Sequence, residues 1–228
     1  MSSLGRKFLM AGKSGLNLTH SERHDTFLKR FDGEHRLKPY LDAFPADAIR
    51  EWADALGVET FVGSSGRVFP NEMKAAPLLR SWLRKLRSYG LNIVVRHKWM
   101  GWDEDGRLVF ETPQGQILIQ SPVTVLALGV ASWPQLGSDG RWQNILDAKN
   151  ISLAPLKPSN CGFEVEWSNH LRSSFQGHPL KGVALKVGDQ TASGECVVTD
   201  YGLEGGPVYV LSKVLRANIE TDGSETLT

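Results

Sequence analysis

The sequence is poor in cysteine and has no long apolar run. Cysteine occurs only twice in 228 residues, as Cys161 and Cys196, and neither stands in a Cys-x-x-Cys or His-containing metal spacing. No apolar run approaches the roughly 20 residues that cross a bilayer, and no secretory signal pattern follows Met1. The sequence therefore predicts a reduced, cytoplasmic protein with no metal site and no membrane partner.

Net charge is nearly absent as well. Lys and Arg number 26 against 25 Asp and Glu, which leaves a formal charge of +1. Nucleic-acid binding generally leaves a basic excess, so we expect no nucleic-acid partner. The one basic stretch, around Arg80 to Arg87, lies opposite an apolar stripe of ordinary width, which favours a solvated helix face.

Glycines and cations are concentrated near the N-terminus, in residues 5–19. The segment reads GRKFLMAGKSGLNLT. Glycines let backbone N–H groups approach an anion, and successive amides in such a turn form an anion-binding concavity. Arg6, Lys7 and Lys13 add positive charge. The composition is suited to a ligand that carries phosphate.

The closest mechanistic motif for this segment is the nucleoside-triphosphate loop. Gly12-Lys13-Ser14 matches the end of that motif, but its first glycine should stand at position 7, which is Lys7. No strand pattern precedes the segment, so the sequence disfavours an NTPase. Taken alone, the segment is also compatible with a cationic, poorly ordered chain end.

Helices and a meander are expected in the middle of the chain. Apolar residues at helical spacing predict one amphipathic helix from Pro45 to Gly57 and a second from about 73 to 88. Residues 91–96 have the pattern of a strand. Residues 99–111 and 116–119 predict a meander, with turns at 103–106 and 113–115. The stretch 21–44 shows no sustained period, and only 26–30 suggests a helical turn or two.

A short, unbroken apolar run at 123–128 is typical of a parallel strand that is buried on both faces. A loop with three glycines follows, from Gly129 to Gly140. In open α/β sheets ligands lie beyond the carboxyl ends of strands, so this loop is a candidate ligand contact. From residue 151 the sequence changes to short strand-like pieces at 161–167, 182–187, 195–199 and 208–211, and a polar tail that we expect to be frayed begins at Thr221.

Six segments, in this order, resemble the HI0933-like, or BaiN-like, group of bacterial flavoproteins. They are 5–19, 67–70, 124–129, 131–140, 160–163 and 199–207. The resemblance runs over essentially the whole chain. It implies an FAD-dependent oxidoreductase acting on a small-molecule substrate, and it leaves open whether NAD(P)H is used and which side chains are catalytic.

The resemblance also implies which parts of the family pattern are absent. Members begin with a strand, a Gly-x-Gly-x-x-Gly turn and a helix that hold the FAD pyrophosphate, and none of these precedes residue 5 here. The family's C-terminal segment, which returns to the nucleotide domain, is not found either. We therefore expect this chain to correspond to the middle of a longer flavoprotein. The fold class expected is α/β, with a partial, Rossmann-like FAD-binding domain of three-layer character at 1–148 and a truncated, mainly β inserted substrate domain at 149–228.

Two functional alternatives remain open at this point. The chain is either a flavin-dependent oxidoreductase or a non-catalytic fragment of one that does not bind FAD by itself. By resemblance, the residues expected at the FAD are Gly5, Arg6, Lys7, Ala11, Gly12, Lys13, Ser14, Gly15, Asn17, Gly129, Ser132, Trp133 and Pro134. Val130 stands where many members have a second glycine, which would slightly crowd the cofactor.

Overall fold

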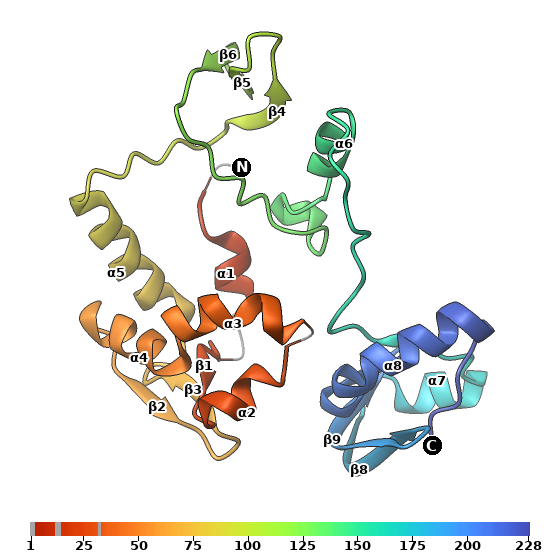
Figure 1. Ribbon diagram of the computed structural model, residues 1–228. Coiled ribbons are helices and arrows are strands. Elements are labelled where there is room, and N and C mark those ends of the chain that lie inside the picture. Colours follow the sequence, from red (N-terminus) through yellow and green to blue (C-terminus); the bar gives the residue numbers. More distant parts are fainter. Residues whose placement is uncertain (1–2, 12–14, 32) are drawn as a thin grey trace. The chain divides into compact units, whose positions relative to one another are not determined.

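The structure is a computed structural model that describes residues 3–11, 15–31 and 33–228. It divides into two compact units, Met1–Leu153 and Ala154–Thr228 (Figure 1). Three sheets are present in the described residues, and every strand pair in them is antiparallel. The protein is therefore a mixed α and β structure built on antiparallel sheets. The parallel sheet that we expected is not seen in the described part of the chain.

The first unit holds two of the sheets. Its elements are α1 (Arg6–Ala11), β1 (Thr19–His20), α2 (His24–Leu28), α3 (Glu34–Ala43), α4 (Ala46–Ala55), β2 (Thr60–Val62), β3 (Arg67–Pro70), α5 (Ala75–Ser88), β4 (Lys98–Trp102), β5 (Leu108–Thr112), β6 (Gly115–Ile119), the 3-10 helix η1 (Pro134–Leu136) and α6 (Trp142–Asp147). The sheet orders are β1-β3-β2 and β4-β5-β6.

The core of this unit lies between α4, α5 and the chain around β1. Leu78 and Ala53 are completely buried there and pack with Leu16 and Ala75. Trp52 and Trp82 extend the packing between the two helices, with their rings edge to face and their centroids 5.3 Å apart. Helix α1 packs against α5, so residues 6–11 are held against this core.

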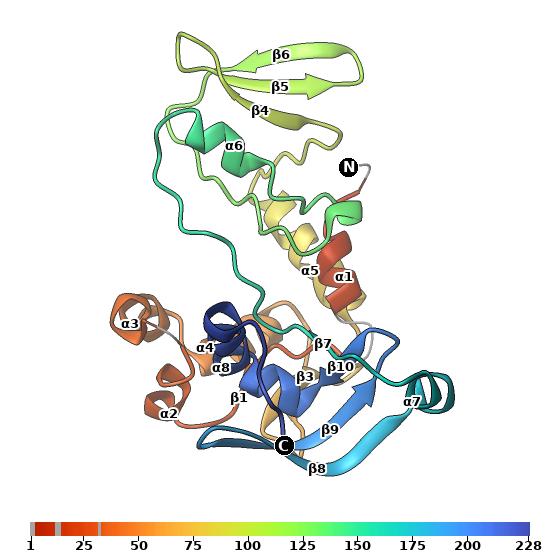
Figure 2. The ribbon, with the colours of Figure 1, turned by 90° about the vertical axis from the view of Figure 1, so that its right-hand side faces the viewer.

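Both predicted helices of this unit are confirmed, as α4 and α5. Pro45 is the N-cap of α4, consistent with its fixed φ, and the chain turns at Gly57 after the helix. The predicted meander is confirmed as β4-β5-β6, and α6 lies against β4 (Figure 2). The stretch 21–44, for which the sequence indicated only a turn or two, forms the two helices α2 and α3.

Two predicted strands of this unit are wrong. Residues 91–96 and 123–128 belong to no strand or helix. A strand needs a neighbour to pair its backbone N–H and C=O groups, and among the described residues no strand pairs with either segment. Apolar composition was therefore not enough to form a strand at either place.

The second unit consists of one sheet and two helices. Its elements are β7 (Phe163–Glu164), α7 (Asn169–Phe175), β8 (Pro179–Val187), β9 (Gln190–Val198), β10 (Gly202–Gly205) and α8 (Gly206–Asp222). The sheet order is β7-β10-β9-β8. Helix α8 covers the sheet through Val208, Leu211 and Leu215, all buried. The predicted strands within 161–167, 182–187 and 195–199 correspond to β7, β8 and β9.

Two expectations for this unit are wrong. Residues 208–211 lie in α8 and form no strand, because the apolar residues at 208, 211 and 215 follow helical spacing and Pro207 fits the first turn. The tail is not frayed at its end, since the backbones of Lys186 and Thr228 exchange two hydrogen bonds of 2.6 and 3.1 Å. Leu227 also packs on the core, which holds the tail against β8.

Candidate functional site

Lys7 connects the N-terminal segment to the loop after residue 128. Its ammonium group donates to Oγ of Ser132 at 2.7 Å, and Oγ of Ser138 lies 3.4 Å away. Lys7 is half-buried on α1, and α1 is held by its packing on α5. Two segments that are more than 100 residues apart in the chain therefore meet at one cation and two hydroxyl groups.

The loop from Gly129 to Trp142 is held by its own hydrogen bonds. The hydroxyl of the buried Ser138 donates to the carbonyl of Val130, and the indole N–H of Trp142 donates to the carbonyl of Gly129 at 3.1 Å. Trp133 and Ser138 exchange backbone hydrogen bonds of 3.1 and 3.3 Å on either side of η1. These bonds fix where Ser132 and Ser138 stand, so Lys7 meets an ordered loop.

Gly129 is required at the start of this loop. Its φ is +74°, a conformation that side chains other than glycine rarely adopt. A Cβ atom there would lie 3.2 Å from Oγ of Ser138, closer than ordinary van der Waals contact. The absent side chain therefore leaves Ser138 free to reach the carbonyl of Val130 and to lie beside Lys7.

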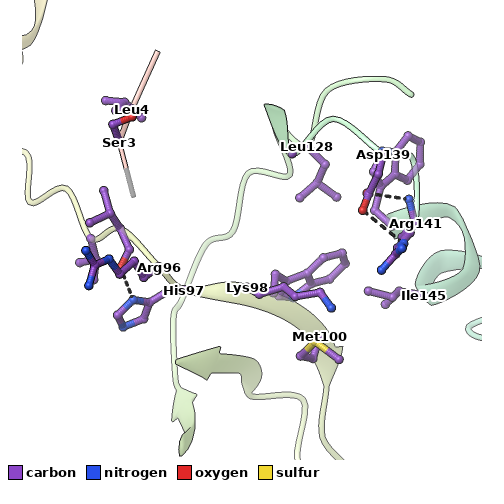
Figure 3. A pocket seen from close by; sticks show the side chains of 15 residues that line it. Ser3, Leu4, Arg96, His97, Lys98, Met100, Leu128, Asp139, Arg141 and Ile145 are labelled. Atoms are coloured by element: carbon purple, nitrogen blue, oxygen red, sulfur yellow. Dashed lines mark hydrogen bonds and ion pairs between the residues drawn. The ribbon is translucent and has the colours of Figure 1, made fainter. Parts of the chain in front are cut away.

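A cavity of about 580 Å³ lies next to this cluster (Figure 3). Leu128, Gly137 and Asp139 line it from the loop, and Trp142 and Ile145 line it from α6. Most of the remaining wall comes from residues 94–100. Charged groups are also present in the lining: Nε of Arg141 lies 3.3 Å from a carboxylate oxygen of Asp139, and Lys98 faces Glu111 at 4.0 Å. The cavity thus combines apolar side chains with charged ones.

The other predicted site residues are placed as follows. Gly5, Arg6 and Ala11 belong to α1 or its start, and Arg6 is exposed. Gly15 and Asn17 precede β1, where the backbone N–H of Leu16 donates to the carbonyl of Met73 at 3.1 Å. Trp133 and Pro134 lie at the start of η1 and are exposed. Gly12, Lys13 and Ser14 lie outside the described residues.

Among the predicted residues, the structure brings only Lys7 and Ser132 into direct hydrogen bonding in the described part of the chain. Sequence reasoning missed Ser138, although it lies in the Gly-Ser-Asp-Gly turn of the loop that was singled out. The sequence feature that pointed to this place was the loop with three glycines, but nothing in the sequence says which of its hydroxyl groups turns inward. The expectation that these residues contact a cofactor stays a prediction.

Another resembling segment, 199–207, lies in the second unit. There the hydroxyl of Tyr201 donates to a carboxylate oxygen of Glu204 at 2.9 Å. This hydrogen bond raises the pKa of Tyr201 above its usual value, because ionising the phenol would lose it and place two negative charges together. The hydrogen bond links Tyr201 to β10, to which Glu204 belongs.

The Lys7 cluster has a chemistry that suits an anion. The ammonium of Lys7 and the hydroxyl of Ser132 are donors that suit phosphate oxygens, whereas the hydroxyl of Ser138 already donates to Val130 and accepts from Lys7. The missing Cβ of Gly129 lets the loop backbone stay close. These residues fit a pyrophosphate. In the described residues no group of three or more His, Cys, Asp or Glu side chains is placed to hold a metal ion, and no helix there is long and apolar enough to cross a membrane.

Comparison with known sequences identifies the family. The profile of the HI0933-like protein Rossmann domain matches residues 1–223, nearly the whole chain. The chain belongs to this family. The HI0933-like chain is also 26% identical, over 216 residues, to a protein of Clostridium scindens named 3-dehydro-bile acid delta(4,6)-reductase. That alignment covers 92% of this chain and 51% of the reductase, so the HI0933-like chain spans about half the length of its curated relative.

Proposed function

We propose that this HI0933-like chain carries part of the FAD site of an FAD-dependent oxidoreductase. The observation that carries the proposal is the meeting of Lys7 with Ser132 and Ser138. It joins the cationic, glycine-containing N-terminal segment to the loop after residue 128, the two segments that resemble FAD contacts in the family. A reductase among its relatives supports the same class of activity.

The proposed role of each residue follows from whether its side chain can donate a hydrogen bond to the ligand. Lys7 offsets the charge of the pyrophosphate, and Ser132 donates to one of its oxygens. Ser138, whose hydroxyl donates to Val130, helps to position Lys7 as an acceptor, while Gly129 allows a close backbone approach. FAD supplies hydride transfer when it is bound, and the protein supplies binding and orientation. We propose reduction of a small organic molecule, with NAD(P)H as the first electron donor to test.

A specific observation favours a second possibility, that the 228 residues alone do not hold FAD. The segment at 123–128, which leads directly into the loop, has no strand partner among the described residues, and Val125 is 84% exposed. A loop that follows an unpaired segment is less well fixed than one that follows a strand in a sheet, so the hydroxyl groups of Ser132 and Ser138 would be less preorganised.

The experiment is a flavin-retention assay. The purified chain is mixed with FAD, passed through gel filtration, and its absorbance is recorded in the flavin region. A flavin band that elutes with the protein supports the proposal for this chain. Colourless protein supports the second possibility, and the assay is then repeated on the chain in complex with the unmatched half of the bile-acid reductase. Absence of flavin from both samples overturns the proposal.

A further inference from the structure

Asn17 lies between two residues that are held by the core of the first unit. Its segment leads into β1, which pairs with β3 (Figure 1). The backbone N–H of Leu16 donates to the carbonyl of Met73 at 3.1 Å, and that of Leu18 donates to the carbonyl of Val68 at 2.9 Å. Leu16 and Leu18 pack in the core, whereas Asn17 is exposed. Among the described residues the Asn17 side chain makes no hydrogen bond, so its amide is open to a ligand.

Met73 anchors the start of this segment through its backbone. Its N–H closes the turn after β3 by donating to the carbonyl of Pro70 at 2.8 Å, and its own carbonyl accepts from Leu16. The φ of Met73 is +60°, which is uncommon for a residue other than glycine. Strained backbone of this kind persists only where the surrounding structure holds it, and it clusters at functional sites. Because the backbone alone would favour glycine at this position, the methionine is better explained by its side chain.

The side chain of Met73 covers Gly15. A Cβ atom at Gly15 would lie 2.7 Å from Cε of Met73 and 3.7 Å from a ring carbon of Phe69. Gly15 itself has a φ of +136°, a conformation that other residues rarely adopt. The methyl group of Met73 thus takes the place of a side chain at position 15 and confines the backbone just before Leu16. Met73 is 37% exposed, so its side chain remains partly accessible from solvent.

We propose that Met73 is a positioning residue of the FAD site, which holds the backbone at residues 15–16 and so fixes where the amide of Asn17 meets the cofactor. The inference rests on the proposed function, because Gly15 and Asn17 are among the residues that resemble FAD contacts in the family. Met73 acts through its carbonyl on the N–H of Leu16 and through its methyl group against Gly15. An unbranched, flexible side chain suits such an irregular gap. The missing side chain of Gly15 therefore makes room for Met73, and Asn17 meets the ligand.

Met73→Gly separates this role from ordinary stability. Glycine adopts a positive φ without strain, so the variant relieves the backbone while it removes the methyl group over Gly15. Asn150→Gly is the matched control, because Asn150 is also exposed in the first unit and has a φ of +57°. Both variants are expected to melt within about 3 °C of the parent chain. Met73→Leu keeps an apolar side chain of similar size and should behave like the parent in every assay.

Hydrogen exchange of the Leu16 amide is the readout that needs no flavin. This amide should exchange about 10-fold faster or more in Met73→Gly than in the parent, because the backbone before it is no longer confined. Its exchange should be unchanged in Met73→Leu and in Asn150→Gly. The amide of Leu18, which is bound to Val68, is the internal reference. Exchange at Leu16 that is equal in Met73→Gly and the parent overturns the proposal, whether or not flavin is bound.

Titration with FAD, followed by quenching of flavin fluorescence, measures the consequence for the cofactor. The dissociation constant should rise about 10-fold or more in Met73→Gly and in Asn17→Ala. It should stay within about 2-fold of the parent value in Met73→Leu and in Asn150→Gly. FAD binding that Met73→Gly leaves unchanged overturns this inference alone. Absence of FAD from every preparation of the parent overturns the proposed function, and this inference with it.

Discussion

The ammonium group of Lys7 lies 2.7 Å from the hydroxyl oxygen of Ser132, across 125 residues of sequence. The contact joins α1, which packs on α5, to a loop that is fixed by Ser138 and Trp142. A cation held by two neutral hydroxyl groups is not neutralised by them. The positive charge of Lys7 therefore remains available to an anion.

Ser132 and Ser138 are expected to respond differently to alanine. Ser138 is buried and donates to the carbonyl of Val130, so Ser138→Ala should lower the free energy of unfolding by about 1–2 kcal/mol. Ser132 is exposed, so Ser132→Ala should leave stability within about 0.5 kcal/mol of the parent. Both should weaken FAD binding. Urea unfolding followed by tryptophan fluorescence measures the first effect, and equal stability of the two variants would contradict the structure of the loop.

The two cysteines are expected to differ in reactivity. Cys196 is completely buried and burial raises the pKa of its thiol, whereas Cys161 is partly accessible. An aromatic disulfide reagent should modify one thiol in the native protein and a second only in denaturant. Cys161→Ser should abolish the native reaction. Modification of that variant at the same rate would show that Cys196 is open to solvent.

Gly205 is expected to be irreplaceable where Gly206 is not. At Gly205 φ is +123°, and a Cβ atom would lie 2.7 Å from Cα of Cys196 and 2.8 Å from the carbonyl oxygen of Glu195. Gly205→Ala should cost about 3 kcal/mol or more, from backbone strain and backbone contact together. At Gly206 the closest atom would be 3.7 Å away, so Gly206→Ala should be nearly neutral. Thermal unfolding followed by circular dichroism distinguishes them, and similar losses in both would be inconsistent with this strand pairing.

Acid should weaken the first unit through Glu22. The hydrogen bond from Arg30 lowers the pKa of the Glu22 carboxyl in the folded protein. A lowered folded pKa gives stability that is present above the unfolded value, about 4.3, and lost as the pH falls through the folded value. Glu22→Gln should therefore melt at a lower temperature than the parent at pH 7 and at the same temperature near pH 2. Glu51→Gln, at an exposed glutamate, is the control, and its melting temperature should match that of the parent at both pH values. If Glu22→Gln still melted below the parent by the same difference near pH 2, the stability would have to come from another group.

Local patterns in the sequence were enough to predict several elements. The helical period at 49–56 and 79–86 predicted α4 and α5, and the turns at 103–106 and 113–115 predicted the meander, because these elements are determined by residues close in sequence. The start of α8 was missed although it had local signals. Pro207 and the spacing of Val208, Leu211 and Leu215 were both readable as a helix.

The strand at 123–128 could not be settled from its own residues. Its composition is that of a strand, but a strand exists only when a neighbour accepts its hydrogen bonds, and that neighbour is a matter of tertiary structure. The same holds for the candidate site. Motif order indicated that the segments around Lys7 and Ser132 belong together, yet the inward-facing hydroxyl of Ser138 depends on the path of the loop.

The most direct test of the proposed FAD site is the affinity for FAD of the parent chain, Lys7→Met and Lys149→Met, measured by quenching of flavin fluorescence in the same preparation of chain or complex. Lys149 is exposed in the same unit, so the control removes the same charge elsewhere. Loss of a charge-assisted hydrogen bond predicts a dissociation constant about 10-fold or more higher for Lys7→Met and an unchanged one for Lys149→Met. Equal affinities for all three proteins would contradict a pyrophosphate site at Lys7.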